Sequence, residues 1–177
     1  MGITSKQLAD MQQRLTNGTE TASALKNYKG SQIILGVDPS LRGTGYGVIN
    51  TSKSIPTTLA QGTIKCPSSW SMSRCFLEIS NQLEAVIGET SPTVAAIEGI
   101  FFAQNIKTAL IMGQARGAAL TAITKAGLDS FEIAPRKVKQ AIVGFGGAQK
   151  EAVAKMIQTR LALSKTPSPD AADALAI

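Results

Sequence analysis

The stretch ILGVDPSLRGTGYGVI, residues 34–49, is the part of the sequence that decides the fold. Its apolar beginning, together with Ile33, is typical of a strand buried on both faces of a sheet. Residues 45–50 and 58–64 indicate two further strands in hairpin succession. Three consecutive strands joined in this way predict an antiparallel half of a sheet.

Downstream of the third strand, helical and strand patterns alternate. Apolar spacing and end residues predict two more strands, 93–97 and 131–134, and helices at 70–87, 105–126, 135–143, 148–163 and 170–177. The first helix is expected to stop before Gly88 and the second before Gly127. Because each later strand follows a helix, both should join the sheet in parallel. The sequence therefore predicts an α/β fold with a mixed five-stranded sheet, three antiparallel strands and then two parallel ones, and helices on both faces.

The composition sets limits on function. Hydrophobic residues make up 44% and charged residues 17% of the 177 residues, as in an ordinary globular domain. There is no histidine, which excludes Ser-His-Asp and Cys-His catalysis and any histidine-ligated zinc site. No apolar run reaches the roughly 20 residues that span a bilayer, and the N-terminal region has no signal-peptide core. We therefore expect no membrane association and a reducing, cytoplasmic location.

The chain divides into an extension and one domain. Residues 1–31 are mostly polar and contain one candidate short helix, so we interpret them as an N-terminal appendage and linker. The domain is expected to cover residues 32–177. Its last helix, 170–177, is too short to be stable by itself, which predicts a truncated helix and a chain that is a fragment.

The excess of basic residues is concentrated in one region. The chain carries 18 lysines and arginines against 12 acids, a net charge of +6. Between residues 136 and 165, Glu151 is the only acid, against Arg136, Lys137, Lys139, Lys150, Lys155, Arg160 and Lys165. Such a face is typical of a protein that binds a polyanion, most often nucleic acid. The alternative interpretation is a lysine-rich helical surface in contact with water only.

Four carboxylates stand in apolar surroundings, where an unpaired charge is costly. Asp38 follows the apolar run of the first strand, and Glu98 follows the apolar strand 93–97. Asp170 and Asp173 are three residues apart within DAADALAI, so they face the same side of a helix. Carboxylates brought together in such a setting repel each other unless a cation lies between them. Hard oxygen donors without histidine or thiolate select Mg²⁺ or Mn²⁺.

Two of these acids also have a purely structural interpretation. Asp170 could cap the last helix, and Asp38 could open a turn with Pro39. Glu98 is followed by glycine and apolar residues and has no such alternative. The four acids together, beside a basic face, predict a two-metal phosphoryl-transfer site.

Five motifs carry a resemblance to a known family. They are ILGVDPSLRGTGYGVI, IEGIFFAQN, MGQARGAAL, APRKVKQAIVG and DAADALAI, in this order within residues 33–177. Over this range the chain resembles RuvC, the bacterial Holliday junction endonucleases. The resemblance implies an RNase H-like fold and a Mg²⁺-dependent endodeoxyribonuclease that cuts two strands of like polarity at a four-way DNA junction, in recombination and repair. It also implies a homodimer, a branch-migration partner and a nucleoid-associated bacterial protein.

The resemblance assigns roles to individual residues. The catalytic acids, which hold two metal ions (Mg²⁺, or Mn²⁺ in its place), are matched by Asp38, Glu98, Asp170 and Asp173. The family's DNA contacts are matched by Phe101, Arg42, Asn105, Arg116, Arg136, Lys139 and Lys150. Phe101 corresponds to an aromatic that stacks on unpaired bases, and core packing is its alternative. A solvated or structural role is the alternative for the basic residues.

The chain departs from the family's usual pattern in four places. Ser40 replaces the usual glycine after Asp-Pro, and Gln104 replaces the usual lysine or arginine before Asn105. Residues 1–31 have no counterpart, and the last helix stops at Ile177 where family members continue it.

Two further segments have an expected role. The helix 105–126 carries small or apolar residues almost all round, so we expect it to be buried both against its own sheet and against a partner subunit. The glycine-rich loop 144–147 could offer backbone N–H groups to a phosphate, or could be only a tight turn between helices.

Other functions share part of this pattern. An actin-like or sugar-kinase-like ATPase has an Asp-led, glycine-rich turn after its first strand, but it needs a second domain for which the chain has no room. A related RNase H-like nuclease acting on RNA or on other branched DNA would share the first acid, but not GQARG or DAADALAI in this register. A non-catalytic junction-binding protein is the remaining alternative, if the truncated end disables the site.

Overall fold

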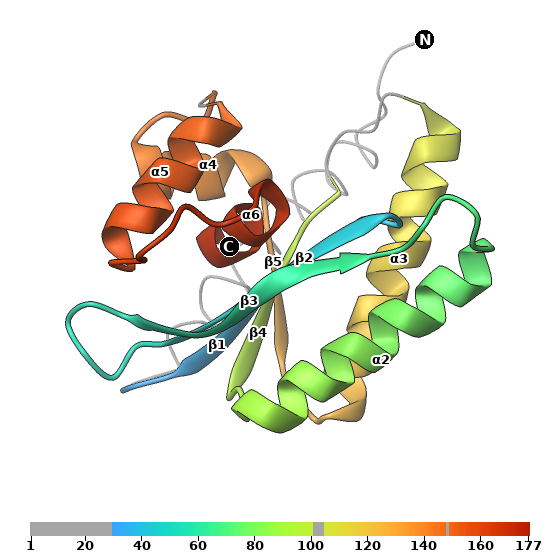
Figure 1. The fold of residues 1–177 in the computed structure, drawn as a ribbon, viewed down its shortest axis with the longest axis horizontal. Helices are drawn as coiled ribbons and strands as arrows, with labels where there is room; N and C mark the ends of the chain where they lie inside the picture. The colour runs from blue at the N-terminus through green and yellow to red at the C-terminus, as the bar shows by residue number, and fades with distance from the viewer. Residues whose placement is uncertain (1–29, 101–104, 148) are drawn as a thin grey trace, which may run out of the picture. The chain divides into compact units, whose positions relative to one another are not determined.

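The computed structural model of the chain describes residues 30–100, 105–147 and 149–177 (Figure 1). The candidate helix within residues 1–29, Phe101 and Gln104 lie outside the described residues. The described unit runs from Ser31 to Ile177, and the interpretation of residues 1–31 as an appendage stays a prediction.

A mixed five-stranded sheet forms the centre of the domain (Figure 1). Its spatial order is β3-β2-β1-β4-β5, and its strands are β1 (Ile33–Asp38), β2 (Gly43–Asn50), β3 (Thr57–Lys65), β4 (Val94–Glu98) and β5 (Ser130–Ile133). β2 is antiparallel to β1 and β3, whereas β4 is parallel to β1 and β5 is parallel to β4. The predicted sheet is confirmed.

One face of the sheet is covered by two long helices, α2 (Met72–Thr90) and α3 (Ile106–Lys125) (Figure 1). Large aliphatic side chains fill the space between these helices and the sheet. The fully buried ones include Leu35, Val37, Ile79, Leu83 and Ile123. This face therefore contains the main hydrophobic core and most of the burial that stabilises the domain.

The opposite face carries α6 (Pro169–Ala176), whose backbone lies directly on glycines of β1 and β2. A Cβ atom added to Gly45 would lie 2.0 Å from the carbonyl oxygen of Asp170, and one added to Gly36 would lie 2.1 Å from that of Ala174. The register of the β1–β2 pair places both glycines on this face. Any side chain there would push the helix away from the sheet.

Two further helices, α4 (Pro135–Val143) and α5 (Lys150–Arg160), lie beside α6 on this side of the sheet (Figure 1). The apolar cluster that joins the three helices contains Val138, Val153, Ile157, Leu175 and Ala176. α6 has only eight residues, a length at which an isolated helix is marginal in water. It is stabilised by burial of most of its length.

Two predicted helix ends were wrong. α2 does not stop before Gly88 but continues to Thr90, and Ser91 ends it in the left-handed conformation at a φ of +48°. A glycine inside a helix costs only about 1 kcal/mol, and the buried stripe that includes Ile87 outweighs this cost. α5 is shorter than the predicted 148–163, because the chain turns at Ala162, which has a φ of +49°.

The start of α6 does not support the alternative in which Asp170 caps the last helix. Ser168 occupies the cap position, Pro169 begins the helix, and Asp170 lies inside its first turn. Asp170 is therefore free of a capping role. The predicted end of α3 is confirmed by Gly127, which follows the helix with a φ of +72°.

Candidate active site

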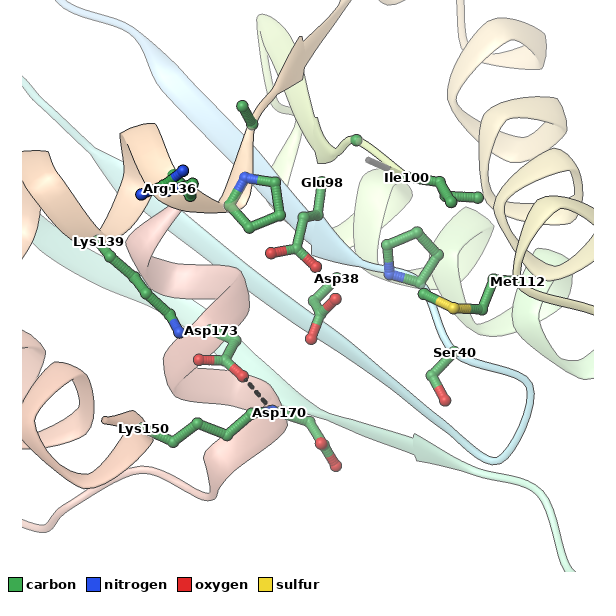
Figure 2. A pocket seen from close by; sticks show the side chains of 14 residues that line it. Asp38, Ser40, Glu98, Ile100, Met112, Arg136, Lys139, Lys150, Asp170 and Asp173 are labelled. Carbon is green, nitrogen blue, oxygen red and sulfur yellow. Dashed lines mark hydrogen bonds and ion pairs between the residues drawn. The ribbon is translucent and has the colours of Figure 1, made fainter. Parts of the chain in front are cut away.

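Two carboxylates meet at the edge of the sheet where β1 and β4 end. Asp38 is the last residue of β1 and Glu98 is the last residue of β4, and the residues before them, Val37 and Ile97, are paired in the parallel register. The carboxyl ends of adjacent parallel strands lie side by side, so the two acids are neighbours. Figure 2 shows their side chains pointing toward one another.

The helix α6 brings two more carboxylates to the same place. Asp170 and Asp173 line a pocket of about 630 Å³ together with Asp38 and Glu98 (Figure 2). They reach it because α6 rests so closely on the sheet: a Cβ atom on Gly43 would lie 3.1 Å from a carboxylate oxygen of Asp170. All four acids singled out in the sequence therefore line one pocket.

The surroundings of the Asp38–Glu98 pair favour the protonated form. Burial, followed by the negative charge of Asp38, raises the pKa of Glu98 to about 8. Burial also raises the pKa of Asp38, against the lowering effect of its hydrogen bond with Glu98. The surroundings of the pair therefore disfavour ionisation of both carboxyl groups, most strongly that of Glu98.

Three basic side chains also line the pocket: Arg136 and Lys139 from α4, and Lys150 from the start of α5 (Figure 2). Lys150 Nζ donates a hydrogen bond to Asp173 Oδ2 at 2.8 Å, and this interaction raises the pKa of the lysine. Arg136 is exposed and Lys139 is half-buried. Part of the basic region seen in the sequence therefore belongs to the same pocket as the four acids.

The donor set suits a hard divalent cation. The four acidic side chains of the pocket offer only carboxylate oxygens, and a cation would relieve the penalty that burial and the charge of Asp38 impose on ionised Glu98. The side chains do not yet form a closed cage, because no group of three or more acidic or cysteine residues within the described ranges is placed to hold a metal ion. Asp173 is held by Lys150, and Asp170 is turned away from Asp38 (Figure 2). As placed, Asp170 and Asp173 therefore do not converge with the Asp38–Glu98 pair on one point.

Comparison with known proteins identifies the family. The profile described as crossover junction endodeoxyribonuclease RuvC matches residues 34–177. The chain belongs to the RuvC family. Relatives with this name include those of Heliobacterium modesticaldum, 43% identical over 82% of this chain and 90% of the relative, and of Marinobacter nauticus, 46% identical over 82% of each.

A solved RuvC structure supports the same assignment. The fold is similar to that of Thermus thermophilus RuvC in complex with a Holliday junction substrate, with a TM-score of 0.76 and 32% identity over 82% of this chain and 90% of that chain. The RNase H-like fold expected from the resemblance is confirmed. The ATPase alternative is not retained, because the RuvC match covers the whole described domain except its first residues.

Arg42, one of the residues that match DNA contacts in the RuvC family, has structural partners. Its Nη1 donates hydrogen bonds to the carbonyl oxygens of Pro67 and Trp70 and to Cys75 Sγ. These bonds tie the turn after β1 to the loop before α2. A guanidinium group used in this way supports the structural alternative for Arg42, and its contact with DNA stays a prediction.

Arg116 and Asn105 also have partners within the domain. Arg116 forms an ion pair with Glu132 that joins α3 to β5. Asn105 caps α3, since its side chain accepts a hydrogen bond from the Thr108 N–H at 2.9 Å. Asn105 therefore has a capping role, whereas DNA contacts by these two residues, and by Phe101, stay predictions.

Some residues of the pocket were missed in the sequence. Met112 from α3 and Ile100 line it beside the acids. The apolar pattern of helix 105–126 gave no signal for Met112, because such a residue is equally typical of a core or of an interface. In the described ranges no helix combines the length and the apolar character needed to cross a bilayer.

Proposed function

We propose that this protein is a structure-selective endonuclease that resolves Holliday junctions, the four-way DNA intermediates of recombination and repair. One observation carries the proposal: four carboxylates and three basic side chains line a single pocket in a member of the RuvC family. Relatives at 43% and 46% identity are named crossover junction endodeoxyribonucleases, and the similar Thermus structure holds a Holliday junction substrate. The basic side chains offset the repulsion between the acids of the pocket and a phosphodiester.

The four acids would hold the metal ions of the reaction. Their oxygens suit Mg²⁺, with Mn²⁺ as a substitute, and we assign two ions to each site. Bound by these residues, the ions would supply activation of a water nucleophile and charge compensation for the leaving 3′ oxygen. Glu98 must first lose its proton, because a ligand carboxyl must be ionised.

The basic residues position the DNA. Arg136 and Lys139 line the pocket with the acids, where they can bind backbone phosphates of the DNA. Lys150 has a second role, since its hydrogen bond orients the Asp173 side chain. The ammonium group of Lys150 lines the same pocket and is a third candidate contact for a substrate phosphate.

Asp38→Asn is the variant that tests the proposal. It keeps the size of the side chain and removes one negative charge from the site, so Mg²⁺-dependent cleavage of a four-way junction should fall by about a thousandfold or more. Binding of the junction in a gel-shift assay should be unchanged or slightly tighter, and steeply salt-dependent. Folded Asp38→Asn protein that cut junctions at the parental rate would contradict the four-carboxylate site.

The same assay separates the alternatives when linear duplex and RNA are included. Preferential cleavage of RNA would favour an RNA-processing nuclease. Binding of junctions by the parent protein without cleavage, at saturating Mg²⁺ or Mn²⁺, would favour a non-catalytic junction-binding protein.

A homodimer formed through α3 belongs to the proposal, since a four-way junction presents two symmetric strands. Among the described residues, the buried positions of α3 lie on one side of the helix, so the expected second buried side is not seen there. Ile106 is 80% and Leu110 is 62% exposed, and Gly113 and Gly117 have open space around them. A second copy would cover this apolar side.

Sedimentation at tens of micromolar protein tests the dimer. Leu110→Glu should give a monomer. Leu77→Glu is the matched control, since this leucine of α2 is equally exposed at 61% and lies outside the proposed interface. A parent protein that is monomeric at this concentration would contradict the proposal. A branch-migration partner and a nucleoid-associated, cytoplasmic location follow from the same proposed function and stay predictions.

A further inference from the structure

An exposed phenylalanine next to the pocket has no part in the site described above. Phe145 lies in the loop that joins α4 to α5, and 68% of its surface is exposed. It belongs to neither apolar cluster of the described residues. A single exposed apolar residue needs no explanation by itself, so the position of Phe145 is what matters.

The loop that carries Phe145 packs on the basic side of the pocket. A Cβ atom on Gly146 would lie 3.4 Å from the carbonyl oxygen of Arg136 and 4.0 Å from its Nε. The two helices that the loop joins contribute Lys139 and Lys150 to the same pocket. Phe145 is therefore the exposed aromatic side chain between two helices whose cations are placed to bind DNA phosphates.

Glycines on both sides of Phe145 shape the loop and leave room for the ring against it. Gly144 ends α4 with a φ of +81°, a conformation that favours glycine and turns the chain out of the helix. A Cβ atom on Gly147 would lie 2.9 Å from two carbons of the Phe145 ring. The ring thus lies against the backbone of its own loop, which lowers the entropy that it would lose on binding a ligand.

We propose that Phe145 stacks on a base of the DNA that is bound along α4 and α5, outside the catalytic pocket. The inference rests on the proposed function, because the neighbouring cations bring DNA to this surface only if DNA is the substrate. Stacking needs one free face of a base. A continuous duplex offers no such face, whereas bases at a crossover can be unstacked, so the contact should favour branched over linear DNA.

Junction binding by fluorescence anisotropy tests this role, in the full chain carrying Asp38→Asn so that the DNA stays intact. Phe145→Ala should weaken binding of a four-way junction by roughly 5- to 150-fold, while binding of a linear duplex stays the same. Phe145→Tyr should bind as tightly as the parent, because it keeps the π face. The slope of affinity against salt should not change, since no phosphate contact is lost.

Leu77→Ala provides the matched control. Leu77 is another apolar side chain that is 61% exposed, and it lies on α2, away from the basic helices α4 and α5. Its affinity for the junction should equal that of the parent. Melting temperatures of the Phe145 variants should also equal that of the parent, which excludes a folding defect.

Photocrosslinking adds a direct readout. With 5-iododeoxyuridine at successive positions around the crossover, irradiation should link the DNA to the peptide that contains Phe145, and Phe145→Ala should abolish this link. Unchanged junction binding by Phe145→Ala and no crosslink to the 144–147 loop would overturn the inference, and would favour a protein partner at this ring. If the parent bound and cut junctions in that case, the proposed function would stand; if the parent did neither, both would fall.

Discussion

The two faces of the sheet are packed in different ways. On the face of α2 and α3, large aliphatic side chains such as Leu83 and Ile123 separate the helices from the sheet. On the opposite face, α6 rests on the glycines of β1 and β2 with its backbone against theirs. The first arrangement buries the most apolar surface. The second leaves no room for the helix to shift, and so it holds Asp170 and Asp173 beside the strand-end acids.

This difference separates stability from activity. Side chains between a helix and a sheet can adjust when one of them is shortened, although the loss of buried area lowers the free energy of unfolding. A backbone-to-backbone contact cannot adjust to an added atom. Substitutions on the α2–α3 face should therefore change mainly stability, whereas substitutions under α6 should change the geometry of the site.

Gly45→Ala should have the largest effect. The added Cβ atom would lie 2.0 Å from the Asp170 carbonyl oxygen, so α6 must move. A displacement of about 1 Å in a catalytic group can lower the rate about a hundredfold, and we expect at least that loss in junction cleavage, with a stability loss of about 1–3 kcal/mol. The matched control is Gly88→Ala, an alanine in open space on α2, which should be fully active and about 0.5–1 kcal/mol more stable. Parental activity of Gly45→Ala would show that the glycine contact does not position the acids.

Leu83→Ala should have the opposite profile. The side chain is completely buried, so truncation should lower the free energy of unfolding in urea by about 2–5 kcal/mol. Cleavage per folded molecule, measured well below the melting temperature, should stay parental because the site lies on the other face. Leu77→Ala, on the same helix but exposed, should change stability by about 0.5 kcal/mol or less. A loss of cleavage rate in folded Leu83→Ala protein would contradict the separation of the two faces.

The pH dependence of stability should show a smaller effect, confined to the site face. Folding raises the pKa of Glu98 from 4.5 to about 8. The folded state therefore binds this proton more tightly than the unfolded state, so the contribution of Glu98 to stability is complete below about pH 4.5 and is lost as the pH rises through about 8. The melting temperature of the metal-free protein should fall, relative to that of Glu98→Gln, as the pH rises over this range.

Two additions sharpen this measurement. At pH 8, Mg²⁺ should raise the melting temperature of the parent more than that of Glu98→Gln, because the cation compensates the charge of the ionised Glu98 carboxyl group. Glu89→Gln, at an exposed position of α2, should follow the parent at every pH. Parallel pH profiles for the parent and Glu98→Gln in EDTA would mean that the environment of Glu98 does not disfavour its ionised form.

The sequence by itself determined the order and type of the elements and the identity of the four acids that line the pocket. The apolar run 33–37, the helical spacing of 105–126 and the stop at Gly127 are local signals, because periodicity and end residues depend on neighbours along the chain. Asp38 and Glu98 could be singled out for a similar reason, since each directly follows an apolar strand and adjacent parallel strands end at the same edge.

Only the tertiary structure decided how these parts fit together. The contact of Gly45 with Asp170 joins residues far apart in the chain, so it leaves no local signal in the sequence. The glycines of β2 therefore indicate only a turn and a strand, and not the surface on which a helix packs. In the same way, the chain cannot show that Lys150 bonds Asp173 or that Arg42 holds a loop. The sequence does not show whether a charged side chain binds a carboxylate, a carbonyl or a phosphate, because the packing of distant elements determines its partner.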